Sequence, residues 1–138
     1  MMILDSNVIS ALMRPDPDRT VLKWFDRQPR SSIWTTSVSV FEIQLGLQLM
    51  PAGMRRSVLL AEVEFFMEQI DHRVAPFDEA AAGHTADLMA SRQRMGQPRD
   101  LRDTMIAGIV RAQHSSLATR NLSHFDDISA SVVNPWAA

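Results

Sequence analysis

The sequence predicts an α/β protein in which a short, mainly parallel central sheet lies between two layers of helices. Short apolar runs alternate with longer stretches of helical periodicity along the whole chain. Such alternation is typical of β-α-β units, which form parallel sheets with helices on their faces. The 138 residues contain no internal repeat, low-complexity tract or linker, and this length suits one domain better than two. We therefore expect residues 1–138 to form a single three-layer α/β/α sandwich.

The first half of the chain opens with a strand and a helix. The apolar run 2–4 ends at a polar turn, as buried strands do, and apolar residues at helical spacing follow up to residue 13. The proline-containing segment 14–17 then breaks that periodicity. A second helix is expected around residues 21–25, and the β-branched and aromatic residues 33–36 predict the second strand.

Two long helices are expected next, over residues 37–50 and 54–70, with Pro51-Ala52-Gly53 between them. The first carries apolar residues on two faces, so we expect it to be mostly buried. Small Ala107 and Gly108 indicate that a later helix packs closely on a neighbour. The remaining elements alternate as before: a strand over 73–77, helices over 79–95 and 101–113, and strands over 116–119 and 132–133.

Composition narrows the environment in which the protein works. Cysteine is absent, which excludes disulfides and thiolate metal sites and fits a reducing cytoplasm. No apolar run approaches the roughly 20 residues of a membrane span, and no secretory signal is recognisable. The net charge of −2 provides no overall basic footprint, so any contact with nucleic acid must come from a local basic patch. We therefore expect a cytoplasmic protein with no membrane partner.

Four polar residues stand at or near junctions between a strand and a helix: Asp5, Glu42, Asp103 and Asn121. The carboxyl ends of parallel strands meet at one edge of the sheet, where ligands bind, so we expect these side chains on one rim. Like charges crowded together are unfavourable unless a cation joins them. Oxygen ligands suit Mg²⁺ or Mn²⁺, so the pattern indicates a divalent metal site.

The same acids also have structural interpretations. Asp5 can cap the helix that follows it, and Ser39 and Glu42 have the spacing of a capping box. Asp100 can cap the helix expected over residues 101–113, which leaves Asp103 one turn inside that helix. Because a cap and a metal ligand would occupy the same place at the sheet edge, both interpretations stay open.

Four short blocks carry a resemblance to a known family: Leu4-Asp5-Ser6-Asn7-Val8-Ile9, Ser39-Val40-Phe41-Glu42-Ile43-Gln44-Leu45-Gly46, Asp103-Thr104-Met105-Ile106-Ala107 and Ala118-Thr119-Arg120-Asn121. In this order and spacing they resemble the blocks of PIN-domain ribonucleases. Within that group the chain is most similar to the VapC toxins of type II toxin–antitoxin systems, in the FitB-like branch. The ending Val133-Asn134-Pro135-Trp136 is similar to that branch too. The resemblance covers the whole chain.

The resemblance implies a Mg²⁺- or Mn²⁺-dependent endoribonuclease that hydrolyses RNA phosphodiester bonds and, as a toxin, inhibits translation and growth. By analogy, Asp5 and Asp103 bind the metal. Glu42 completes the catalytic acids, either as a ligand through water or by orienting the attacking water. Asn121 stands where many relatives carry a fourth acid, and its lack of charge weakens the case for a second metal site. The implied partners are RNA and a VapB-type antitoxin, with the protein forming a homodimer or a higher oligomer with the antitoxin.

Substrate contacts are expected around the same blocks, from Ser6, Asn7, Arg102, Thr119 and Arg120. Three further arginines that precede Asp103 could hold the RNA backbone, although a solvated helix face and loop explain them equally well: Arg92, Arg94 and Arg99. Three histidines are expected to be structural or surface residues: His84, His114 and His124.

Two other functions remain open from the residues. A phosphoaspartyl protein, either a receiver-type module or a phosphatase, also places an aspartate at a strand end. The phosphatase normally needs a second aspartate where this chain has Asn7, and both need a lysine near the phosphate, whereas the only lysine is Lys23 in an expected helix. The other alternative is a catalytically weak PIN domain that acts by binding RNA or a partner, because Asn121 carries no charge.

Overall fold

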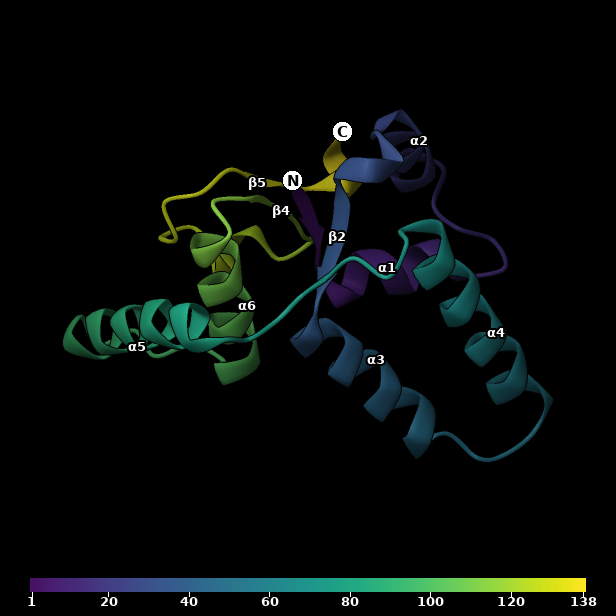
Figure 1. Ribbon diagram of the computed structural model, residues 1–138, viewed down its shortest axis with the longest axis horizontal. Coiled ribbons are helices and arrows are strands. Elements are labelled where there is room, and N and C mark those ends of the chain that lie inside the picture. Colours follow the sequence, from purple (N-terminus) through teal and green to yellow (C-terminus); the bar gives the residue numbers. More distant parts are fainter.

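The computed structural model describes residues 1–138 and contains one five-stranded parallel sheet (Figure 1). The strand order is β3-β2-β1-β4-β5, so the first strand lies at the centre and pairs with β2 on one side and β4 on the other. The expected parallel α/β class is confirmed. The strands are β1 (Met2–Leu4), β2 (Ile33–Thr36), β3 (Val74–Ala75), β4 (Ser116–Ala118) and β5 (Val132–Val133).

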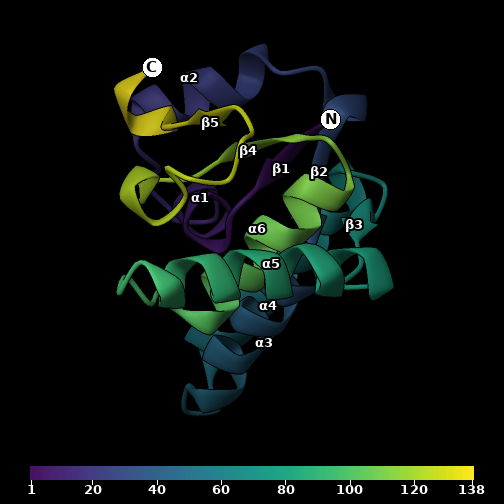
Figure 2. The ribbon, with the colours of Figure 1, turned by 90° about the vertical axis from the view of Figure 1, so that its left-hand side faces the viewer.

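Six α-helices surround the sheet: α1 (Ser6–Leu12), α2 (Arg19–Arg27), α3 (Ser37–Leu49), α4 (Met54–Gln69), α5 (Glu79–Arg94) and α6 (Leu101–Ala112). Helices α5 and α6 lie on one face, and α1, α2 and α4 lie on the other (Figures 1 and 2). None of the helices combines the length with the apolar character that a membrane crossing requires. Three short 3₁₀ helices were not expected from the sequence: Arg30–Ser32, Leu122–His124 and Pro135–Ala137.

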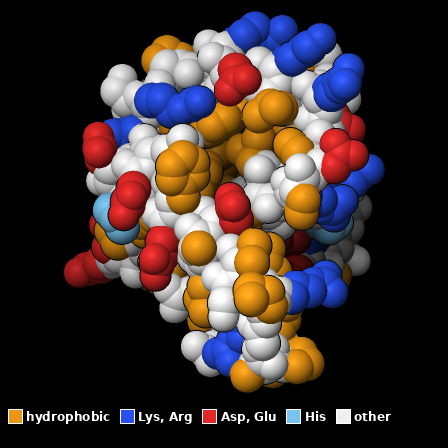
Figure 3. Space-filling view, turned by 90° about the vertical axis from the view of Figure 1, so that its right-hand side faces the viewer, with side chains coloured by type: hydrophobic (Ala, Val, Ile, Leu, Met, Phe, Trp, Pro, Cys, Tyr) orange, Lys and Arg blue, Asp and Glu red, His pale blue; other side chains and the backbone are white.

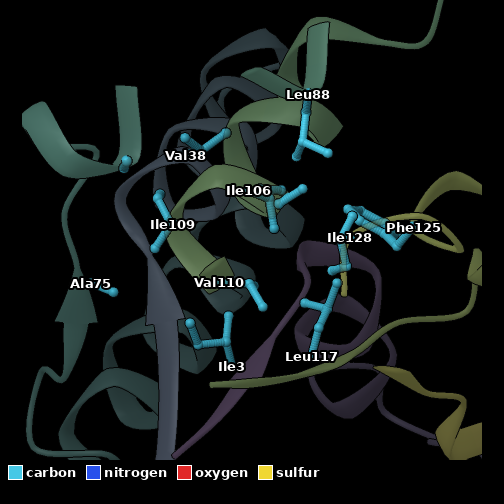
Figure 4. Packing of buried hydrophobic residues seen from close by; sticks show 12 residues of the cluster. Ile3, Val38, Ala75, Leu88, Ile106, Ile109, Val110, Leu117, Phe125 and Ile128 are labelled. Atoms are coloured by element: carbon cyan, nitrogen blue, oxygen red, sulfur yellow. The ribbon is translucent and has the colours of Figure 1, made fainter. Parts of the chain in front are cut away.

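The sheet divides the hydrophobic core into two clusters, because successive side chains of a strand point to opposite faces. Ile3 and Leu117 pack against Ile106, Ile109 and Val110 of α6 (Figure 4). The next residues along the same strands, Leu4 and Ala118, join the second cluster with α1, α2 and α4. Both clusters fix the central strands firmly, and with them the residues that follow each strand.

Helix α6 approaches α5 closely at Gly108. A Cβ atom added there would lie 2.0 Å from Thr85 Oγ1 and 2.6 Å from the Ala81 carbonyl oxygen. Such distances leave no room for a side chain. The close helix contact expected from Ala107 and Gly108 is therefore confirmed, and it fixes the second half of α6 against α5.

Helix α3 is much more exposed than the sequence suggested. Phe41, Leu45 and Leu49 are exposed, although the helix was expected to be mostly buried, and that prediction is wrong. The reason is that α3 leaves the carboxyl end of β2 and projects from the body together with α4 (Figure 1). Only Val38, Ser39 and Leu47 of this helix are buried.

Candidate active site

The carboxyl ends of β1, β2 and β4 meet at one edge of the sheet, and the expected site residues lie there. Asp5 directly follows β1, and Thr119 directly follows β4. Glu42 comes from α3, which begins immediately after β2. Since all three strands are parallel and adjacent, residues far apart in the sequence come together at this edge.

Asp5 is buried and surrounded by hydrogen-bond donors. Its Oδ1 accepts from the Ser6 backbone N–H at 2.8 Å, so it caps α1 as one interpretation predicted. Its Oδ2 accepts from the Thr119 hydroxyl at 2.8 Å and from the Asn7 side-chain amide at 3.5 Å. Burial raises the pKa of Asp5, and the charge of Asp103 raises it further, while the Thr119 and Ser6 hydrogen bonds oppose that change.

Glu42 points back toward Asp5 from the second turn of α3. The Ser6 hydroxyl lies 3.4 Å from its Oε1. Burial and the charge of Asp5 raise the pKa of Glu42, and nearby Arg102 acts in the opposite direction. The capping-box interpretation is wrong, because Thr36 caps this helix by accepting from the Ser39 N–H at 3.0 Å. The carboxylate of Glu42 is therefore left for another role.

Asp103 lies one turn inside α6, as expected, because the Asp100 side chain caps that helix and accepts from the Asp103 N–H at 3.0 Å. Its carboxylate contacts His124, whose Nδ1 is 2.9 Å from Asp103 Oδ2. His124 was expected to be a structural or surface residue and it is exposed, but the sequence did not show that it contacts Asp103. The only signal in the sequence was its position three residues beyond Asn121, in the segment that follows a strand end.

A buried ion pair holds the segment that carries His124. The Arg92 guanidinium donates to both carboxylate oxygens of Asp127, at 2.9 and 2.7 Å, and to the His124 carbonyl at 3.3 Å. Arg99 binds the Ser123 carbonyl at 3.0 Å and forms an ion pair with Asp126 at 2.8 Å. The hypothesis that Arg92 contacts RNA is wrong, because its side chain is buried in this network.

The remaining expected site residues are more exposed. The Asn121 side chain makes no hydrogen bond, but its backbone N–H donates to Thr119 Oγ1 at 3.1 Å. The Arg120 N–H donates to Asn7 Oδ1 at 3.3 Å, and its guanidinium lies 5.0 Å from the centre of the Trp136 ring. Arg102 is 3.9 Å from Glu42 Oε2. All of them therefore lie around the three acids, in an outer ring.

The donor set at this edge consists of oxygens from Asp5, Glu42 and Asp103. No three acidic or histidine side chains lie close enough together to hold a metal ion directly. The three acids nevertheless interact electrostatically, because the charge of Asp103 raises the pKa of both Asp5 and Glu42. Mg²⁺ keeps several of its waters and binds through one or two carboxylates. The residues present fit a hydrated divalent cation of this kind.

Fold and site together define an α/β/α protein with an acidic site at the carboxyl edge of its sheet. Residues 2–130 match the family described as PIN domain. The chain is 37% identical to VapC ribonuclease Y4jK of Sinorhizobium fredii, over 99% of this chain and 98% of that protein. The chain therefore belongs to the PIN domain family, which confirms the resemblance seen in its sequence blocks.

Two further comparisons support the same placement. Toxin FitB of Neisseria gonorrhoeae is 30% identical, over 99% of both chains. The crystal structure of FitAcB from the same organism superimposes with a TM-score of 0.92 and 29% identity, and it covers 100% of both chains. The similarity thus extends over the full length and includes the exposed α3–α4 projection.

Proposed function

We propose that this protein is a Mg²⁺- or Mn²⁺-dependent endoribonuclease that acts in the cytoplasm as the toxin of a VapBC-type toxin–antitoxin system. One observation carries the proposal: Asp5, Glu42 and Asp103 converge at the carboxyl edge of the sheet, and their charges are coupled. Relatives named as a VapC ribonuclease and as a toxin support the choice of reaction and biological role.

The three acids would divide the work of phosphodiester hydrolysis. Asp5 and Asp103 would hold the cation, and Thr119, Ser6 and His124 orient these two carboxylates by hydrogen bonds. When bound, a divalent cation lowers the pKa of water and offsets negative charge on the phosphate. Glu42 has a raised pKa, so its carboxylate is suited to orient the attacking water and to accept a proton from it.

The polar residues of the outer ring would contact the substrate. Ser6 and Asn7 lie directly beside Asp5, and Arg102 and Arg120 supply positive charge on either side. Asn121 would act through its backbone, because its N–H supports the Thr119 hydroxyl that binds Asp5. The absence of a fourth carboxylate at this position favours a site with one strongly held cation.

The surface next to the acids is suited to a protein partner. A cavity of about 680 Å³ extends from Ser6 and Glu42 between α1, α3 and α4, and Ile43, Leu47 and Leu59 are among its lining residues. Large apolar side chains also gather on the α3–α4 projection (Figure 3). Exposed apolar surfaces of this extent mark interaction sites. We expect a VapB-type antitoxin to occupy the cavity with an arginine against the acids, and the projection to serve homodimer formation.

Cleavage of RNA by the purified chain tests the proposed function and its alternatives. We expect wild-type protein to cleave a single-stranded RNA in Mg²⁺ or Mn²⁺ and to stop when EDTA removes the cation. Asp5→Ala and Asp103→Ala should each abolish cleavage while the circular dichroism spectrum stays unchanged. RNA binding without cleavage by the wild type would instead indicate a weak PIN domain. Phosphorylation of Asp5 by acetyl phosphate would favour the phosphoaspartyl class.

A further inference from the structure

A second cavity lies beside Asp5, on the side of α1 that faces the C-terminal segment. Its volume is about 510 Å³, and Ser6, Asn7 and Ser10 of α1 form one wall. Arg14 and Arg120 line it together with the Trp136 ring. Because Ser6 and Asn7 also bind the Asp5 carboxylate, this cavity and the acidic site share wall residues.

The two arginines that line the cavity, Arg14 and Arg120, have no ion-pair partner in the protein. The one acid on its wall, Asp18, caps α2 and accepts from the Thr20 and Val21 N–H groups at 2.8 and 3.2 Å. Two free guanidinium groups thus face a polar hollow in a chain whose net charge is −2.

The structure also holds Arg120 in place for a ligand. Its backbone N–H donates to Asn7 Oδ1 at 3.3 Å, and its guanidinium stacks over Trp136 at 5.0 Å from the ring centre. The Trp136 backbone N–H donates to Asn134 Oδ1 at 3.0 Å, and its side chain packs against the core cluster that contains α2 residues. A stacked guanidinium keeps its planar edge free, and that edge matches the geometry of a phosphate.

We propose that this cavity binds a backbone phosphate of the RNA next to the phosphate that is cleaved, through Arg14 and Arg120. The proposal rests on the proposed ribonuclease function and extends it, because it assigns a substrate subsite that the three acids do not form. Arg120 is the residue after Thr119, whose hydroxyl binds Asp5. A phosphate held at Arg120 would therefore set the register of the strand relative to the acids, and Trp136 would act as a positioning residue.

Salt-dependent RNA binding tests this assignment directly. The background is the full chain with Asp103→Asn, so that RNA stays intact, and the probe is a fluorescein-labelled single-stranded RNA in Mg²⁺. Each phosphate contact with a single strand contributes about 0.7 to the slope of log affinity against log salt. Arg14→Gln and Arg120→Gln should each lower that slope by about 0.7 and weaken binding about fivefold at 0.1 M salt.

Two control variants make the result specific. Arg111→Gln removes the same charge at the last turn of α6, near the amino end of β4 and far from the acids in the topology, and should leave the slope unchanged. Arg120→Lys should keep the slope, because the charge remains, but lose affinity, because the stacked planar group is gone. Melting curves of all variants should coincide with that of the Asp103→Asn background.

The outcomes separate the subsite from the activity. Wild-type cleavage of RNA together with unchanged slopes for both Arg14→Gln and Arg120→Gln would overturn the subsite and leave the proposed function intact. An equal loss in Arg111→Gln would also overturn it, because the effect would then be one of net charge. A wild type that neither binds nor cleaves RNA would overturn the proposed function, and the subsite with it.

Discussion

Replacement of Arg92 by methionine should strongly destabilise the protein without removing any group that touches RNA. The guanidinium is only 2% exposed and makes hydrogen bonds to Asp127, Thr104 and the His124 carbonyl. Loss of one partner of a buried ion pair costs about 3–5 kcal/mol. The Asp127 carboxylate is 26% exposed and keeps Arg99 at 3.5 Å, so the lower end applies, about 3 kcal/mol.

This free energy converts into a shift of the melting temperature. The entropy of unfolding is about 2.1 cal/mol/K per residue, or about 0.3 kcal/mol/K for 138 residues. A loss of about 3 kcal/mol therefore lowers the melting temperature by about 10 °C. Arg94→Met is the matched control, because this exposed arginine lies two residues further along α5, forms no ion pair and should change stability by less than about 0.5 kcal/mol.

The pH dependence of the same variant gives an independent check. The hydrogen bonds from Arg92 hold the pKa of Asp127 below its ordinary value of 3.8. An acid with a lowered folded-state pKa stabilises the protein above its unfolded pKa, and this contribution is lost as pH falls through the folded pKa. The difference in stability between wild type and Arg92→Met should thus be full at neutral pH and shrink below pH 3.8. An unchanged melting temperature together with weaker RNA binding would refute the structural role of Arg92.

Three further predictions concern α6, Asp5 and His124. Gly108→Ala should lower stability by about 1–3 kcal/mol in urea unfolding, because its Cβ would overlap Thr85; unchanged stability would mean that the helices can separate. Asp5→Asn should stabilise the metal-free protein at neutral pH, because burial raises the Asp5 pKa above 3.8 and makes its charged form unfavourable. That gain should shrink in melting curves as pH falls through the raised folded pKa and vanish well below pH 3.8, where the carboxyl is protonated in both the folded and the unfolded state. His124→Ala should lower kcat and Mn²⁺ affinity about 10- to 100-fold at an unchanged melting temperature, since it frees the Asp103 carboxylate.

Local patterns were sufficient to predict most of the fold. The apolar run before Asp5 predicted a strand that ends at the site, and the Asp100 side chain caps α6 where its sequence position suggested. Small residues at 107 and 108 predicted a close contact with a neighbouring element, and the structure shows that this neighbour is α5. The strand and the cap depend on residues within one or two turns, and the small residues show that α6 can approach a neighbour closely, although they do not show which neighbour it is.

Contacts between distant residues could not be predicted in the same way. Arg92 and Asp127 are 35 positions apart, and only the packed structure shows that they form the ion pair that supports His124. The prediction that α3 is mostly buried failed for a related reason. Periodicity shows that the apolar residues Phe41 and Leu45 lie on one face of a helix. It does not show whether another part of the same chain covers that face.

The central claim is that Asp5 and Asp103 at the sheet edge together hold a divalent cation. Mn²⁺ binding, measured by calorimetry on the metal-free protein, tests it most directly. The variants are Asp103→Asn and the control Asp87→Asn, which removes an equal charge from an exposed position on α5. We expect one binding event in the wild type, the same affinity in Asp87→Asn, and at least about tenfold weaker binding in Asp103→Asn. Equal affinities in all three proteins, or no binding in the wild type, would contradict the claim.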